Sequence, residues 1–233
     1  MKRIILIIFA SALAALHSRA AVLVQWTFEN SRPAASGFHD AETGGGQASG
    51  SHASAATSYT SPIGNGSGYS FASNHWEAGD FYQFTFSTLG ASGITLGFDQ
   101  GSSLTGPGNF EILYSTGGAF ISTGKTYSVY EYTSPVTAYS FGAWSATAAK
   151  SEYSYIFDLS DLQALDNQAS VTIRLQMIGA STPSGGTVAT AGVSRLDNFT
   201  VSYATTVPEP GSAALFSLMA LGISAKRRRL FRE

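Results

Sequence analysis

Tyr82-Gln83-Phe84-Thr85-Phe86-Ser87 is the stretch that decides the fold, because large aromatic and polar residues alternate strictly along it. Successive side chains of a β-strand point to opposite faces, so this period of two predicts a strand with one buried face. The same alternation recurs at residues 94–98 and 110–114, and the connectors between these stretches are rich in Gly, Ser and Pro. Strand, turn and strand at this spacing predict an antiparallel sheet.

The rest of the body repeats this alternation in further short stretches. Further strands are predicted at residues 22–29, 69–71, 126–132, 137–144, 153–159, 171–178 and 196–203. Residues 32–60 hold mainly Ala, Ser, Gly and Thr, which predicts a long loop or a weak edge strand. A turn or two of helix is expected only at 159–165, with Asp161 as the candidate cap. We therefore expect an all-β fold, an antiparallel β-sandwich of the jelly-roll type, with an immunoglobulin-like topology as the alternative.

The N-terminus has the pattern of an export signal. Lys2 and Arg3 precede an apolar run over residues 4–16, and Ser18 and Ala20 supply small residues just before Ala21. This predicts a secretory signal peptide at 1–20, cut by signal peptidase after passage through the general secretion machinery. A retained N-terminal anchor is the alternative.

The C-terminus combines three ordered features. The stiff, proline-bearing motif Val207-Pro208-Glu209-Pro210 is followed by an uncharged stretch at 211–225 and by the basic stop Lys226-Arg227-Arg228-Arg229. As a helix, 211–225 would be a marginal membrane span, since the hydrocarbon core is about 30 Å thick. The cations after it would hold the end of the chain in the cytoplasm.

This arrangement resembles the PEP-CTERM sorting signal of Gram-negative surface proteins. The resemblance implies recognition of the motif by an exosortase, transient anchoring in the inner membrane, and release to the cell surface or exterior. The body also resembles PEP-CTERM bodies of unassigned activity, through Trp26-Thr27-Phe28-Glu29, Gly64-Asn65-Gly66-Ser67 and Arg195-Leu196-Asp197-Asn198-Phe199-Thr200-Val201. An ordinary C-terminal anchor or an amphiphilic helix packed on the body is the alternative.

The expected domain organisation follows from both ends. We expect a signal peptide at 1–20, a β-sandwich domain at 21–205 and a sorting signal at 206–233. Within the last, the motif is 207–210, the hydrophobic helix, outside the folded domain, is 211–225 and the basic tail is 226–233.

Charge and composition limit the partners of the body. Between residues 22 and 207, five cations stand against thirteen carboxylates, a net charge of −8. We expect no nucleic-acid partner for so acidic a body. The chain has no cysteine, so its stability must come from a sizeable core.

The sequence holds no catalytic signature, and we expect no enzyme. His39, His52 and His75 match no metalloprotease spacing, and no Gly-x-Ser-x-Gly elbow lies between a strand and a helix. The thirteen carboxylates of the body could include a glycosidase pair, but no spacing singles one out.

One metal site is a candidate. At fold level the body resembles jelly-roll carbohydrate-binding modules, in which a cation often joins adjacent first and last strands. Glu29 ends the first expected strand and Asp197 lies in the last, so this resemblance implies a structural calcium held by both carboxylates. The alternative is that Glu29 pairs with Arg195 or caps a turn. No other cofactor is expected.

Aromatic residues in or near loops could stack on sugar faces. Trp76 and Trp144 are the main candidates, with core packing as the alternative for each. We expect an exported, surface-sorted structural or adhesive protein of the bacterial cell envelope or biofilm matrix, the matrix role resting on the resemblance. The alternative is a secreted carbohydrate-binding module that recognises extracellular polysaccharide.

Overall fold

The structure is a computed structural model that describes residues 16–133 and 135–208 of the 233-residue chain. Residues Ala21–Ala204 form one compact unit. The strands are β1 (Leu16–Trp26), β2 (His39–Asp40), β3 (Gly46–Ser51), β4 (Tyr59–Thr60), β5 (Phe71–Ser73), β6 (Phe81–Phe86), β7 (Thr95–Ser102), β8 (Asn109–Ser115), β9 (Ile121–Ser128), β10 (Tyr130–Glu131), β11 (Ser154–Asp158), β12 (Val171–Met177) and β13 (Ser194–Pro208). Two short 3-10 turns, η1 (Ser151–Tyr153) and η2 (Gln163–Leu165), are the only helical elements among the described residues.

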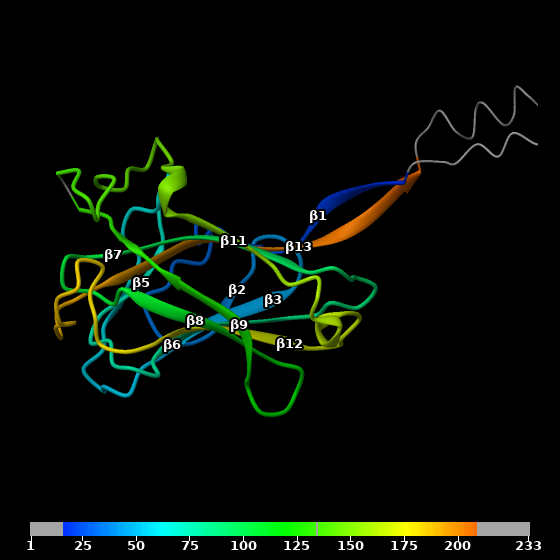
Figure 1. The fold of residues 1–233 in the computed structure, drawn as a ribbon, viewed down its shortest axis with the longest axis horizontal. Coiled ribbons are helices and arrows are strands. Elements are labelled where there is room, and N and C mark those ends of the chain that lie inside the picture. Colours follow the sequence, from blue (N-terminus) through cyan, green and yellow to red (C-terminus); the bar gives the residue numbers. More distant parts are fainter. Residues whose placement is uncertain (1–15, 134, 209–233) are drawn as a thin grey trace, which may run out of the picture. The chain divides into compact units, whose positions relative to one another are not determined.

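These strands form two sheets (Figure 1). The first sheet has the order β10-β7-β13-β5-β4, with β1 also paired to β13 and β11 to β7. The second has the order β2-β3-β6-β12-β8-β9. Within Ala21–Ala204 the strand pairs are antiparallel apart from β10 with β7. The prediction of an all-β sandwich with antiparallel sheets is confirmed.

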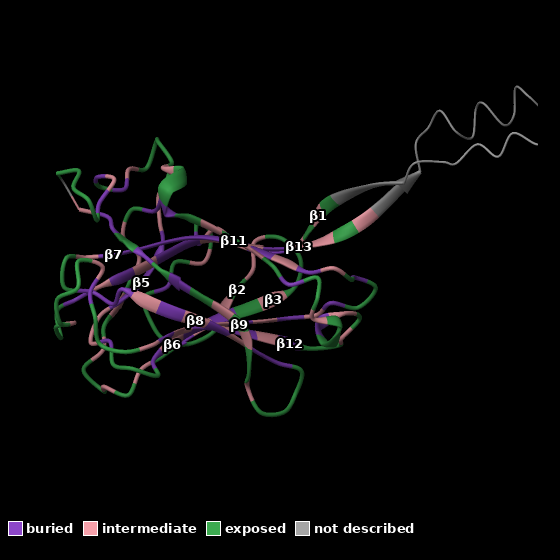
Figure 2. Cartoon of the chain, viewed as in Figure 1, coloured by how far each residue is buried: buried purple, intermediate pink, exposed green. Residues whose placement is uncertain are grey.

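The alternation of large apolar and polar residues along each strand decides which face of each sheet is buried. On β6, Tyr82 and Phe84 are fully buried while Gln83 and Thr85 between them are half-buried. The neighbouring β12 repeats the pattern, with its apolar residues inward. Figure 2 shows the result, with buried segments along the strands and exposed segments mostly in the loops.

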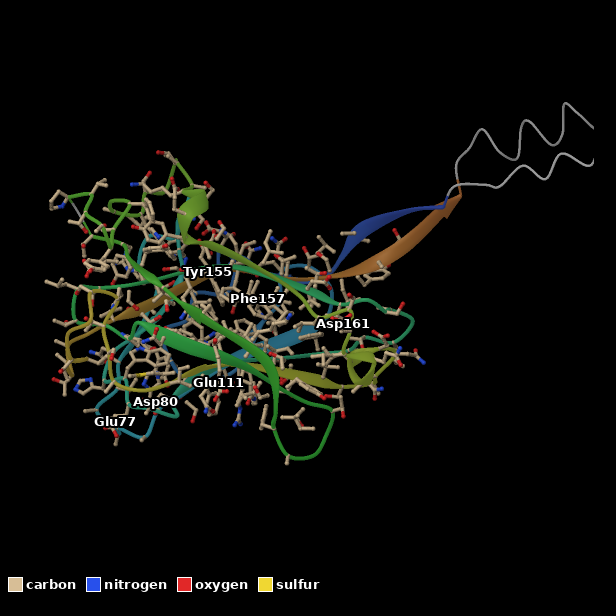
Figure 3. All side chains as sticks on the ribbon, viewed as in Figure 1. Glu77, Asp80, Glu111, Tyr155, Phe157 and Asp161 are labelled. Carbon is tan, nitrogen blue, oxygen red and sulfur yellow. The ribbon has the colours of Figure 1, made fainter. Side chains whose placement is uncertain are left out.

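Aromatic rings join the two sheets across the core. Phe84 of β6 stacks on Phe199 of β13 with centroids 3.6 Å apart and planes at 1°. The edge of the Trp26 ring contacts both, at 5.1 and 5.8 Å. On the first sheet, Tyr155 and Phe157 of β11, labelled in Figure 3, contact the ring of Phe98.

The small residues of 32–60 are explained by the rings that pack on them, which the composition does not show. This segment contains β2, β3 and β4, and β3 pairs along its length with β6. A Cβ on Gly46 would lie 2.8 Å from the Trp26 ring, and one on Gly50 would lie 2.5 Å from Tyr59. Glycine therefore lets two rings pack on β3. Because β3 lies next to the two-residue edge strand β2, the alternative of a weak strand near the sheet edge fits this part of the segment, and the long loop does not.

Two other local predictions need correction. Residues 137–144 form turns and isolated bridges and no strand, because their aromatic residues leave the alternation and join a small separate cluster. That cluster holds Tyr132, Trp144 and Tyr153, with Phe141 against it. Residues 159–165 contain one turn of 3-10 helix, η2, as predicted, but the residue at its N-cap is Leu162 and no side chain caps it, so Asp161 is not the cap.

The predicted processing segments fall mainly outside the described residues. Among residues that the structure does describe, no helix is long and apolar enough to cross a membrane. Val207 and Pro208 are the last residues of β13, while Glu209, Pro210, the hydrophobic stretch 211–225 and the basic tail 226–233 lie beyond the description. At the other end, β1 begins at Leu16 within the predicted signal peptide.

Candidate binding site

A polar hollow lies where β3 ends and the chain turns toward β4. Its volume is about 270 Å³, and its lining is Ser36, Gly50, Ser51, His52, Ser54, Ala55, Thr57 and Tyr59. Small hydroxyl-bearing residues dominate this lining because the segment carries few large side chains. Tyr59 and His52 supply the only two rings of the lining, at 5.6 Å from each other and nearly perpendicular.

His52 is fixed to the loop before β6 by a carboxylate. Its Nδ1 lies 3.1 Å from Asp80 Oδ2. Asp80 also accepts backbone hydrogen bonds from Ala53, at 2.8 Å, and Glu77, at 2.7 Å. Figure 3 shows Glu77 and Asp80 close together at this end of the sandwich. Asp80 thus ties the residues that follow β3 to the residues that precede β6, and so holds the wall of the hollow in place.

The second ring nitrogen of His52 contacts the core. His52 Nε2 lies 3.1 Å from Ser73 Oγ, Ser73 donates to the Tyr82 hydroxyl at 3.0 Å, and Tyr82 donates to the Ser194 carbonyl at 2.9 Å. Asp80, His52 and Ser73 therefore stand in the order of a hydrolase triad. The Ser73 residue is only 1% exposed, so no substrate carbonyl can reach its hydroxyl.

The ionisation of this cluster reflects its burial. Burial lowers the pKa of the His52 imidazole, and the Asp80 carboxylate opposes that shift. Burial, together with the charge of Asp80, raises the pKa of Tyr59 to about 12. A tyrosine phenol is neutral at pH 7 with or without this shift, and it can donate a hydrogen bond to a ligand.

Both tryptophans that the sequence nominated for sugar stacking are buried. Trp76 is 4% exposed and packs on His52, Tyr82 and Phe110. Trp144 is 6% exposed and lies in the small cluster with Tyr132 and Tyr153. The expectation of exposed indole faces is wrong for both residues. The alternative of core packing describes both rings.

The two carboxylates nominated for calcium contact opposite ends of one turn. Asp197 Oδ2 accepts from the Asn65 backbone at 2.9 Å and from the Ser67 hydroxyl at 2.5 Å, and its Oδ1 accepts from Asn198 N at 2.8 Å. Glu29, which is exposed, accepts from the backbone of Tyr69 at 2.8 Å. Three hydrogen-bond donors thus occupy lone pairs of Asp197, whereas Glu29 accepts only one hydrogen bond. The structural calcium stays a prediction. The described residues hold no cluster of three or more His, Asp or Glu suited to a metal.

Asn65 closes the same turn from within. It is 2% exposed, its side-chain oxygen accepts from the Lys150 backbone at 2.8 Å, and its side-chain nitrogen donates to the Lys150 carbonyl at 2.9 Å. The side chain thereby copies the two hydrogen bonds of a β-bridge and ties the turn to the segment before η1.

The sequence analysis did not select His52 as a site residue, and it missed the partners of His52 as well. Asp80 and Ser73 lie 28 and 21 residues away along the chain, and no spacing rule joins them. The available signal was the composition of 32–60, since a stretch of small polar residues leaves room for a hollow beside any large side chain that it contains.

Fold and site together define a β-sandwich with a small hydroxyl-lined surface hollow. No known protein family matches the sequence, and no curated protein does. Among solved structures, the K1 cleaved adhesin domain of Lys-gingipain from Porphyromonas gingivalis W83 is similar at 11% identity and a TM-score of 0.41, over 79% of this chain and 97% of that one. The K3 adhesin domain of the same protein is 15% identical with a TM-score of 0.40, over 78% and 98%.

A third structure, TmCBM61 in complex with β-1,4-galactotriose, is 11% identical with a TM-score of 0.34, over 67% of this chain and 86% of that one. These likenesses are too weak to carry an argument about function, which has to come from the residues of the hollow.

Proposed function

We propose that this chain is an exported, surface-sorted adhesive protein of the cell envelope or extracellular matrix, whose jelly-roll-like β-sandwich binds a sugar residue in the hollow beside His52 and Tyr59. The observation that carries the binding role is the lining of that hollow. Four hydroxyl-bearing residues, Ser36, Ser51, Ser54 and Thr57, line the space together with the Tyr59 phenol. The His52 side chain, which is only 1% exposed, holds this lining in place through Asp80 and Ser73 and does not itself face the ligand. Sugars are held by such hydrogen-bonding groups together with a ring against which their CH faces pack.

The size of the hollow sets the size of its ligand. Pockets for drug-sized ligands have volumes of roughly 300 to 1,000 Å³, and this hollow has about 270 Å³. One sugar ring fits a space of that size better than a longer oligosaccharide does. Affinity for a polymer would then come from repeated weak contacts, as suits an adhesive protein.

The proposal includes no catalysis. A glycosidase needs two carboxyl groups on either side of the scissile bond, and none of the lining residues is Asp or Glu. Asp80, behind the lining, is engaged by His52, Ala53 and Glu77. The hydroxyl of Ser73 is buried and bonded to Tyr82.

Filling the hollow should abolish sugar binding without unfolding the protein. In Ala55→Trp, an exposed lining residue gains a large ring, and we expect affinity on a glycan array to fall by about tenfold or more. The matched control is Ala146→Trp, at an exposed position in another loop. Equal binding by both variants, with unchanged melting temperatures, would refute the role of the hollow.

Export and sorting rest on the two ends of the sequence. We expect the protein recovered from the native cell surface to begin at Ala21 and to lack the residues after the Val207-Pro208-Glu209-Pro210 motif, because signal peptidase and an exosortase would remove them. Intact mass spectrometry reports both ends at once. A mass that includes Glu233 would contradict exosortase processing, and replacing Pro208, Glu209 and Pro210 by alanine should retain the full C-terminus.

A further inference from the structure

Arg174 lies clamped between two aromatic rings on the outer face of the second sheet. Its guanidinium carbon is 3.7 Å from the centroid of Phe81, on β6, and 3.5 Å from that of Phe120, in the connection between β8 and β9. Its Nε donates to Gln83 Oε1 at 2.8 Å. Two stacked rings and one in-plane hydrogen bond fix both the position and the plane of the guanidinium.

The outer edge of this guanidinium has no protein partner. Nε is the only nitrogen of Arg174 with a hydrogen bond to a described residue, and no carboxylate within the described ranges forms an ion pair with it. Burial lowers the pKa of Arg174, because the rings remove part of its hydration. The two remaining nitrogens form a rigid fork that matches the two oxygens of a carboxylate.

The clamp lies on the same sheet face as Ser51, which forms one wall of the hollow, while the Tyr59 wall belongs to the other sheet. Ser51, which lines the hollow, is the register partner of Phe81, and Phe81 is in turn the partner of Gln176 on β12. β3 and β12 are two strand spacings apart, about 10 Å, which a short oligosaccharide spans.

The sheet face beyond the clamp is polar. Thr85 and Thr172 share a hydrogen bond between their hydroxyls at 3.1 Å, and Gln176 donates to Glu111 at 3.4 Å. Glu111, on β8, is labelled in Figure 3. A glycan crossing this face would find hydrogen-bonding groups and the ring edges of Phe81 and Phe120.

We propose that Arg174 is a second sugar subsite, which binds the carboxylate of a uronic acid in a polysaccharide whose neutral sugar occupies the hollow. The inference rests on the proposed sugar-binding function and adds the class of polysaccharide. Since the body carries a net charge of −8 between residues 22 and 207, a uniformly charged polyanion would be repelled. A polymer in which neutral sugars separate the carboxylates keeps most charges beyond the Debye length of about 8 Å at physiological ionic strength, so it is the class that fits.

The test uses oligosaccharides of deacylated gellan, which carry one glucuronate in each four-sugar repeat, and the same oligosaccharides after reduction of the carboxyl groups to alcohols. Wild-type protein should bind the acidic form at least about tenfold more tightly than the reduced form, as one charge-assisted bidentate contact predicts. Arg174→Gln should remove this preference and leave the affinity for the reduced form unchanged. Lys125→Gln, which removes one cation from β9 of the same sheet, should keep the preference.

Arg174→Lys guards against a folding defect, because it keeps the charge and most of the stem that covers the sheet. It should lose most of the preference, since an ammonium group cannot form the fork. An equal affinity of wild type for acidic and reduced forms would overturn the subsite while leaving the hollow intact. A preference that survives in Arg174→Gln would also overturn it. Loss of binding to the reduced form in Ala55→Trp reports on the hollow separately.

Discussion

Replacing Trp26 with alanine should lower the free energy of unfolding by about 3 to 5 kcal/mol, the range for removing a fully buried large aromatic side chain. Trp26 is 0% exposed and contacts Phe84 and Phe86 of the second sheet and Phe199 of the first. The truncated side chain would leave a cavity between the sheets, and the Gly46 that makes room for the indole could not fill it. Denaturant unfolding followed by far-UV circular dichroism measures the change.

The matched control for Trp26→Ala is Ile156→Ala, which shortens a side chain that is 78% exposed. Its expected effect is within about 0.5 kcal/mol. If Trp26→Ala proved as mild as the control, the indole would not be the link between the sheets, and the packing described for the core would be wrong.

Lowering the pH from 8 to 5 should stabilise the protein through Asp197. Burial raises the pKa of this carboxyl from 3.8 to about 7, with hydrogen bonds from Ser67, Asn65 and Asn198 opposing the shift and the neighbouring Asp99 adding to it. A carboxyl whose folded pKa exceeds its unfolded value binds its proton more tightly in the folded state. Its contribution is therefore complete below about pH 4 and is lost as the pH rises toward 7, by about 4 kcal/mol in all.

The Asp197→Asn variant isolates this contribution, since an amide oxygen can still accept from Asn65 and Ser67. Thermal melts of wild type and variant across pH 5 to 8 should differ in slope, with the variant flatter. His52, whose lowered pKa acts in the opposite direction, is present in both proteins and cancels in the comparison. Parallel melting curves would show that Asp197 titrates near its ordinary value.

The sandwich was predictable because its signal is local. Alternation along β6, β8 and β12 needs only neighbouring residues to be recognised, and a buried face on one side follows from it directly. Prediction failed where packing came from distant residues. The small side chains of β3 are explained by the rings of Trp26 and Tyr59, which lie before and after it in the chain.

The candidate site was largely beyond prediction for the same reason. His52 gains its role from Asp80 and Ser73, which β-sheet pairing brings near it, and Arg174 gains its clamp from Phe81 and Phe120 on other segments. Aromatic type alone misled the choice of Trp76 and Trp144, since both large cores and sugar platforms use indoles and only burial separates them. Composition could indicate a hollow but could not identify the residues that line it.

Asn65 has a practical consequence for producing the protein. Asn65-Gly66-Ser67 fits the acceptor sequence for N-linked glycosylation, and in yeast or insect cells the transferase would meet the chain before it folds. A glycan on that amide would block the paired contacts with Lys150 and prevent the turn from closing. Secretion from such hosts should yield misfolded material unless Ser67 is replaced by alanine to remove the acceptor sequence. Because that replacement also removes the hydrogen bond from Ser67 to Asp197, a bacterial periplasm is the better place to make the protein.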